Sequence, residues 1–165
     1  MMKIRMNKLI KLAGAVFFCE SVGILGSLVT LPSMSTWYGA LNKPSFNPPN
    51  FIFGPVWTSL YFLMGVSLFL VLDKKLKSKK LSITRREGVK FFVFQLVLNF
   101  LWSFIFFYMH LPLLAFFEIV ILWMAIMVSI LKFQKISKPA AYLLVPYIFW
   151  VSFAAILNLF IVILN

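Results

Sequence analysis

The side chains best placed to bind a ligand are amides and aromatic residues inside long apolar runs. In one run, Gln95, Asn99 and Trp102 follow one another at spacings of four and three residues, and Ser103 comes directly after them. On a helix these positions share one face. An amide beside an indole offers hydrogen-bonding groups next to a flat apolar surface, a combination typical of small-molecule sites.

Two further apolar runs carry a similar stripe of residues at spacings of three or four. The stripes consist of Trp57, Tyr61 and Gly65 in one run, and of Tyr147, Trp150, Ala154 and Asn158 in the other. If the three faces meet, they would line an apolar, aromatic cavity with a few polar groups. The alternative is that the amides only hold helices together, since interhelical hydrogen bonds contribute about 0.6 kcal/mol on average.

The chain contains few residues of the types that form conventional catalytic or metal sites. One cysteine, Cys19, and one histidine, His110, cannot form a disulfide or a Cys/His zinc site within one chain. The acidic residues are Glu20, Asp73, Glu87 and Glu118. Because no nucleophile–base pair is evident, we predict no catalytic residues of a conventional enzyme, no metal site and no required cofactor.

Glu20 and Glu118 lie inside apolar runs, where a charged side chain costs about 2.5–3.5 kcal/mol on insertion scales. We expect each carboxyl to be protonated or hydrogen-bonded. A proton relay and a partner for a cationic group are the functional alternatives, and the sequence does not choose between them. We expect His110 to be exposed in a tight turn, and Cys19 to be a small buried apolar residue.

The composition as a whole is that of a membrane protein. The 165 residues are 62% hydrophobic and 12% charged, whereas ordinary soluble domains are about 45–50% apolar and about 25% charged. A soluble globule of this size could not hide so much apolar surface from water. The sequence therefore predicts a single membrane domain over residues 1–165, and excludes a large soluble domain or a secreted disulfide-rich fold.

Five nearly uncharged runs each approach the roughly 20 residues that a helix needs to cross a hydrocarbon core. We therefore predict an all-α integral membrane protein, a bundle of five transmembrane helices. The predicted spans are residues 12–31, 54–72, 89–107, 111–131 and 139–164. We expect no cleavable signal peptide, because the first run is too long and contains a carboxylate.

Basic residues lie almost entirely on one side of these spans. Of the 16 lysines and arginines, the opposite side receives only Lys43. The positive-inside rule then predicts a cytoplasmic N-terminus and a C-terminus outside. We predict that the lysine-rich connection 73–90 is a solvated loop that sets this topology. A patch for anionic lipid or nucleic acid is the alternative, and no nucleic-acid partner is expected.

The connection 32–54 is the one long outer loop that we expect. It contains four prolines, which restrict its backbone, and the aromatic residues Trp37, Tyr38 and Phe46. We predict that it acts as a lid over the bundle. An aromatic anchor at the membrane interface is the alternative.

Several of these residues stand in motifs that resemble one membrane-protein family. Residues 37–49, WYGALNKPSFNPP, are similar to the first-loop signature of the TspO/MBR family of tryptophan-rich sensory and translocator proteins, also known as peripheral-type benzodiazepine receptors. Further similar segments are residues 53–57 with Leu60 and Tyr61, residues 95–103, and Pro146 and Tyr147 with Trp150, Phe153, Ala154, Leu157 and Asn158. The resemblance covers about residues 15–165. The chain end lacks the tyrosine and basic residue of the proposed cholesterol motif of animal members, so it resembles a bacterial-type member.

The resemblance implies a five-helix bundle, often a dimer, with a pocket beneath the first loop. The family's pocket binds porphyrins such as protoporphyrin IX and haem, as well as benzodiazepine-type ligands. The implied ligand-binding positions are Trp37, Phe46, Trp57, Tyr61, Gln95, Asn99, Trp150 and Ala154. Some bacterial members are reported to degrade bound porphyrin in light, which implies photochemical roles for Trp57 and Trp150.

We therefore expect a membrane receptor or sensor for porphyrins and similar hydrophobic ligands, a homodimer in a bacterial plasma membrane. A transporter of tetrapyrroles or other amphipathic molecules is one alternative. A regulatory partner of another membrane protein is another. The chain shows no inverted repeat and no broken-helix signal of the kind on which many transporters rely, which argues against the first alternative.

Overall fold

The computed structural model describes residues 2–165, with side chains from Met6 onward. The side chains of Lys3 and Arg5, which belong to the basic N-terminal tail, lie outside the described residues. In chain order the elements are α1 (Met2–Met34), α2 (Trp37–Ala40), α3 (Asn50–Leu72), α4 (Lys79–Ser103), η1 (Phe104–Tyr108), α5 (Pro112–Gln134), α6 (Lys138–Leu143) and α7 (Val145–Leu164). Five helical stretches are long and apolar enough to cross a membrane, which confirms the predicted all-α bundle.

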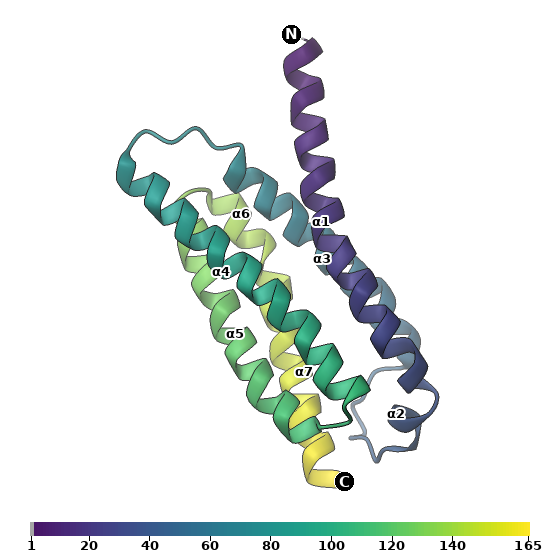
Figure 1. Ribbon diagram of the computed structural model, residues 1–165. Helices are drawn as coiled ribbons and strands as arrows, with labels where there is room; N and C mark the ends of the chain where they lie inside the picture. Colours follow the sequence, from purple (N-terminus) through teal and green to yellow (C-terminus); the bar gives the residue numbers. More distant parts are fainter. Residues whose placement is uncertain (1) are drawn as a thin grey trace.

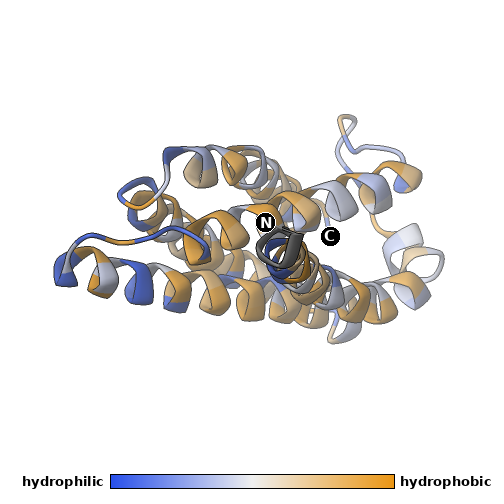
Figure 2. Cartoon of the chain, turned by 90° about the horizontal axis from the view of Figure 1, so that it is seen from above, coloured by the Kyte–Doolittle hydropathy of each residue, from blue (hydrophilic) through white to orange (hydrophobic). Residues whose placement is uncertain are grey.

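The long helices run along one another as an elongated bundle with the two chain termini at opposite ends (Figure 1). Helix α1 packs along α3, α4 packs along α5, and α7 packs against α5. The side chains most deeply buried between them include Met64, Phe92, Leu122, Phe133 and Tyr147. Hydrophobic residues cover the helices along their length, whereas hydrophilic residues gather mainly in the connections and at helix ends (Figure 2). This distribution is that expected of a bundle whose sides face lipid.

The lysine-rich connection is shorter than the sequence predicted. Only residues 73–78 form a loop, and α4 begins at Lys79, ten residues before the predicted span. The hydroxyl of Ser78 caps the new helix start by accepting a hydrogen bond from the backbone N–H of Leu81, at 3.3 Å. The prediction of a solvated loop over residues 73–90 was therefore wrong for residues 79–90, the last two thirds of that segment. Charge marks where the chain leaves the membrane rather than where a helix ends.

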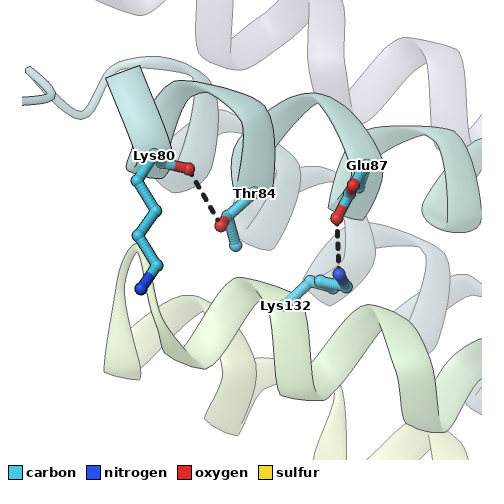
Figure 3. A network of polar contacts seen from close by, with 4 residues as sticks. All are labelled: Lys80, Thr84, Glu87 and Lys132. Carbon is cyan, nitrogen blue, oxygen red and sulfur yellow. Dashed lines mark hydrogen bonds and ion pairs between the residues drawn. The ribbon is translucent and has the colours of Figure 1, made fainter. Parts of the chain in front are cut away.

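The charged first turns of α4 also pack against α5 (Figure 3). The Glu87 carboxylate accepts a hydrogen bond from the Lys132 ammonium, at 2.5 Å. The Thr84 hydroxyl donates to the backbone carbonyl of Lys80, at 3.1 Å, and so needs no partner outside its own helix. These contacts continue the helix beyond the apolar part of the span.

The other spans also differ from their predicted bounds. Helix α1 extends on both sides of the predicted 12–31. The last span is divided at Leu144 into α6 and α7, because Pro146 cannot donate a backbone hydrogen bond and its ring crowds the preceding turn. The third span ends in the π-helical turn η1, where the N–H of Met109 reaches the carbonyl of Phe104 at 3.0 Å. Such turns are frequent at functional sites.

A glycine allows α1 and α3 to approach closely. A Cβ added at Gly65 would lie 2.5 Å from the Cα of Val16, so no larger residue fits without separating the helices. Gly65 was predicted to belong to the cavity-facing stripe of its helix, but the structure places it at this helix–helix contact. Small residues serve this purpose in membrane helices because backbone atoms can then pack directly.

The connection between α1 and α3 is tied to the end of α7. The side-chain carbonyl of Asn165 accepts from the backbone N–H of Asn42, and its amide donates to the backbone carbonyl of the same residue, both at 3.0 Å. Within the connection, the Tyr38 hydroxyl donates to the side-chain oxygen of Asn47, at 2.9 Å. The loop is thus an ordered element at the end of the bundle where the chain terminates.

Candidate functional site

A cavity of about 270 Å³ lies between α1, α3, α4 and α7, and extends to Tyr38 in α2. Its volume is near the lower limit of the roughly 300–1,000 Å³ typical of small-molecule pockets. Its aromatic lining residues include Trp57, Trp102 and Trp150, with Phe53, Tyr61 and Phe106. Its polar lining groups include the amides of Asn50, Asn99 and Asn158. The cavity is therefore aromatic and contains a few polar groups.

Five of the eight predicted ligand-binding residues line this cavity. They are Trp57 and Tyr61 from α3, Asn99 from α4, and Trp150 and Ala154 from α7. The structure therefore brings the three striped helices together at one cavity, whereas the residue spacing predicted only that each stripe shares a face of its own helix. Ligand contact at these positions stays a prediction.

The other three predicted residues lie outside the cavity lining. Trp37 stacks on the exposed His110, with ring centroids 4.4 Å apart. Phe46 packs edge-on against Phe160 at 5.2 Å and is 43% exposed. Gln95 is buried in the bundle core, one turn of α4 from the cavity wall.

A network of buried hydrogen bonds connects the cavity wall to the core. Tyr61 donates from its hydroxyl to the side-chain carbonyl of Asn99. The Asn99 amide donates to the Tyr147 hydroxyl at 3.0 Å, and that hydroxyl donates to the side-chain carbonyl of Gln95 at 2.7 Å. The network joins α3, α4 and α7, so these amides hold helices together and Asn99 also faces the cavity.

Asn158, which is closer to the loop, likewise lines the cavity and forms hydrogen bonds between helices. The indole N–H of Trp102 donates to the side-chain carbonyl of Asn158 at 3.1 Å, and the Asn158 amide donates to the backbone carbonyl of Pro112 at 2.8 Å. These bonds fix the plane of the Trp102 indole, which also stacks on Phe106 with centroids 5.1 Å apart. The aromatic wall of the cavity is thus held in place by interhelical bonds.

Helix α1 also lines the cavity, which was not predicted from the sequence. Small and hydroxyl-bearing residues form half of the lining that α1 provides: Gly23, Gly26, Ser27 and Thr30. A Cβ at Gly23 would lie 2.5 Å from the Tyr61 ring, so this glycine makes room for the tyrosine. The abundance of small residues in the first span was a usable signal, because they mark places where another group approaches closely.

The intramembrane acids occupy different environments. Glu20 lines the cavity. Glu118 is 8% exposed on α5, outside the lining, and neither carboxylate oxygen has a hydrogen-bond partner among the described residues. Cys19 is fully buried, as predicted. Among the residues whose side chains are described, no group of three or more His, Cys, Asp or Glu could hold a metal ion.

The Tyr38 side chain lines the loop end of the cavity. Burial raises the pKa of Tyr38 above its usual value, and the hydrogen bond to Asn47 lowers it only in part. The Lys43 ammonium lies 4.9 Å from the centroid of the same ring and donates to the backbone carbonyls of Gly39 and Leu41. A positive charge therefore sits just behind the tyrosine that lines this end.

Comparison with known proteins gives a consistent assignment. The model of the TspO/MBR family matches residues 15–164. The chain is 45% identical to the tryptophan-rich protein TspO of Chlorobaculum tepidum, over 97% of this chain and 99% of that protein. It is 39% identical to the TspO of Archaeoglobus fulgidus, over 95% and 98%, and 32% identical to the translocator protein of Ovis aries, over 82% and 79%. This integral membrane protein belongs to the TspO/MBR family.

Proposed function

We propose that this protein is a membrane receptor or sensor that binds porphyrins, such as protoporphyrin IX and haem, and similar hydrophobic ligands in the cavity. The observation that carries the proposal is the set of three indoles, Trp57, Trp102 and Trp150, which reach one cavity from three helices. Flat aromatic ligands stack well on indole faces. The Asn99 amide beside them supplies a polar group that can orient the ligand.

The proposal includes a lid role for the connection between α1 and α3. A cavity of about 270 Å³ is small for a macrocycle, so binding requires part of the wall to move outward. Asn42 holds the connection to the end of α7 by three solvent-exposed hydrogen bonds, two to the side chain of Asn165 and a longer one, at 3.4 Å, to the backbone carbonyl of Leu164. Such bonds can open without disturbing the packed core.

We further propose a homodimer in a bacterial plasma membrane, with the N-terminus in the cytoplasm. The connections 73–78 and 135–137 lie with the N-terminus at one end of the bundle, whereas Lys43 is in the connection at the other end (Figure 1). The basic residues flanking the spans thus cluster at the N-terminal end, which the positive-inside rule assigns to the cytoplasm. We also propose light-dependent breakdown of the bound porphyrin: the photoexcited ring takes an electron from Trp57 or Trp150, and dioxygen is the oxidant that the breakdown consumes.

The test is a titration of the detergent-purified protein with protoporphyrin IX in the dark, followed by tryptophan fluorescence and porphyrin absorbance. The variants Trp57→Phe and Trp150→Phe should weaken saturable binding. Trp123→Phe is the matched control, because Trp123 bonds to Ser152 at 2.9 Å and does not line the cavity. Linear quenching that never saturates, or equal effects of all three substitutions, would contradict the proposal.

A further inference from the structure

The cavity carries an uneven set of charges. Glu20 is the carboxylate among its lining residues, and no lysine, arginine or histidine belongs to the lining within the described part of the chain. The other polar groups on the wall are neutral hydroxyls, amides and indole N–H groups. A ligand inside the bundle therefore meets one acid and no base.

Glu20 lies at the inner end of the cavity. It is on α1, fourteen residues before Met34, which lines the loop end. At 1.5 Å of rise per residue, the two positions are about 21 Å apart along the helix. The cavity thus has two distinguishable ends, one deep in the bundle and one under the loop.

The Glu20 carboxyl has no partner of its own among the described residues. Two of the other acids are paired: Asp73 with Lys8 at 3.0 Å, and Glu87 with Lys132 at 2.5 Å. Glu20 is half-buried and forms neither an ion pair nor a hydrogen bond with another described side chain. Since an unpaired acid in a bilayer is unfavourable, its presence in a cavity wall suggests a partner that arrives with the ligand.

The loop end of the cavity lies close to a positive charge instead of a carboxylate. The Lys43 ammonium lies 4.9 Å from the centroid of the Tyr38 ring, and Tyr38 belongs to the cavity lining there. The amide of Asn50 lines the same end. An anionic substituent would therefore find its favourable surroundings under the loop, far from Glu20.

We propose that Glu20 determines which end of a ligand enters the bundle. It selects for a group that is cationic or donates a hydrogen bond, and it excludes a carboxylate from the inner end. The inference rests on the proposed function and deepens it. The ligand class is a flat aromatic ring system whose inner edge is neutral or cationic, and whose acidic groups point to the loop end.

The test compares three macrocycles that differ only in side-chain charge. They are protoporphyrin IX, with two carboxylates, its neutral dimethyl ester, and its bis-amide with ethylenediamine, which carries two ammonium groups. Dissociation constants are measured by fluorescence quenching in the dark for the wild type and for Glu20→Gln, which keeps the shape of the side chain and removes its charge. Glu118→Gln is the matched control, because Glu118 lies outside the cavity.

Glu20→Gln should weaken binding of the bis-amide by about tenfold or more, since hydrogen bonds to charged groups contribute at least that much. It should leave the ester and the dicarboxylate within about twofold, because the ester is uncharged and the carboxylates of protoporphyrin IX lie at the loop end, far from Glu20. Glu20→Asp should preserve the wild-type order of the three ligands. Glu118→Gln should change none of them.

The possible failures are distinguishable. If all three macrocycles bind saturably and Glu20→Gln shifts them equally, or shifts none, the role of Glu20 is wrong and the proposed function stands. If none of them binds saturably to the wild-type protein, the proposed function is wrong and the role of Glu20 falls with it. If Glu118→Gln reproduces the charge-dependent effect of Glu20→Gln, the selectivity does not come from the cavity.

Discussion

The hydroxyl of Tyr61 on α3 donates a hydrogen bond to the side-chain carbonyl of Asn99 on α4, at the wall of the cavity. The same asparagine donates from its amide to the hydroxyl of Tyr147 on α7. The protein itself therefore uses one lone pair of the Asn99 carbonyl and one amide N–H, which leaves the second N–H and the second lone pair for a ligand. The consequence is that Asn99 links three helices as well as facing the space where a ligand would bind.

Asn99→Leu should lower the thermal stability of the protein in detergent. The substitution leaves the buried hydroxyl of Tyr61 without its acceptor and that of Tyr147 without a donor, and such losses cost about 1–3 kcal/mol. Tyr61→Phe removes one bond of the network and should destabilise less. The measurement is thermal unfolding followed by circular dichroism.

Ser59→Ala is the control for this comparison, because the Ser59 hydroxyl is exposed and bonds only to Pro55 within its own helix. It should leave the unfolding midpoint unchanged. An Asn99→Leu variant as stable as Ser59→Ala would show that the network contributes little to holding the helices together.

Gly65→Ala should destabilise the bundle by separating α1 from α3. The added Cβ would lie 2.5 Å from the Cα of Val16, which is backbone and cannot rotate away. Overpacking of this kind costs about 1–3 kcal/mol. Gly14→Ala on α1 is the matched control, because a Cβ there has nothing within 4 Å, and alanine favours a helix by up to about 1 kcal/mol. Equal unfolding midpoints of the two variants would contradict the close contact.

The aromatic part of the site could be predicted because it obeys helical periodicity. Residues spaced by three or four lie on one face whatever surrounds the helix, so the stripes that contain Trp57, Asn99 and Trp150 could each be predicted, although not that the three faces meet at one cavity. Periodicity does not show which turns of a helix face the cavity and which face the packed core. Gln95 shares the face of Asn99, but one turn further it meets Tyr147 and the packed core instead of the cavity.

Two other features could not be predicted from patterns of this kind. The small residues of α1 around Gly23 indicate a close approach, but not whether a helix or a cavity is approached. Hydropathy did not indicate that α4 starts at Lys79, because hydropathy shows only where the chain enters the apolar part of the membrane. The helix extends beyond that boundary into water, where Ser78 caps it. The first feature depends on a contact between segments that are distant in sequence, whereas the second depends on a local cap that hydropathy does not report.

Asn165→Ala should speed the exchange of a bound porphyrin. The substitution removes both hydrogen bonds that hold the backbone of Asn42, so the loop opens more often, while the cavity wall is untouched. Stopped-flow fluorescence should show faster association and faster dissociation, with a smaller change in the dissociation constant. Unchanged rates would mean that the ligand enters between helices rather than beneath the loop.

Illumination of the porphyrin-bound protein should cause a loss of porphyrin absorbance that depends on the cavity tryptophans. Trp57 is the better candidate for the first electron donor, because its ring lies 5.7 Å from that of Tyr61 and 6.2 Å from that of Tyr147, so two phenols are close enough to replace the electron it loses. At ligand concentrations that saturate every variant, Trp57→Phe should slow the loss several-fold and Trp150→Phe should slow it less, while Trp123→Phe behaves as the wild type. An equal rate in all four proteins would show that light breaks down the porphyrin without any contribution from these tryptophans.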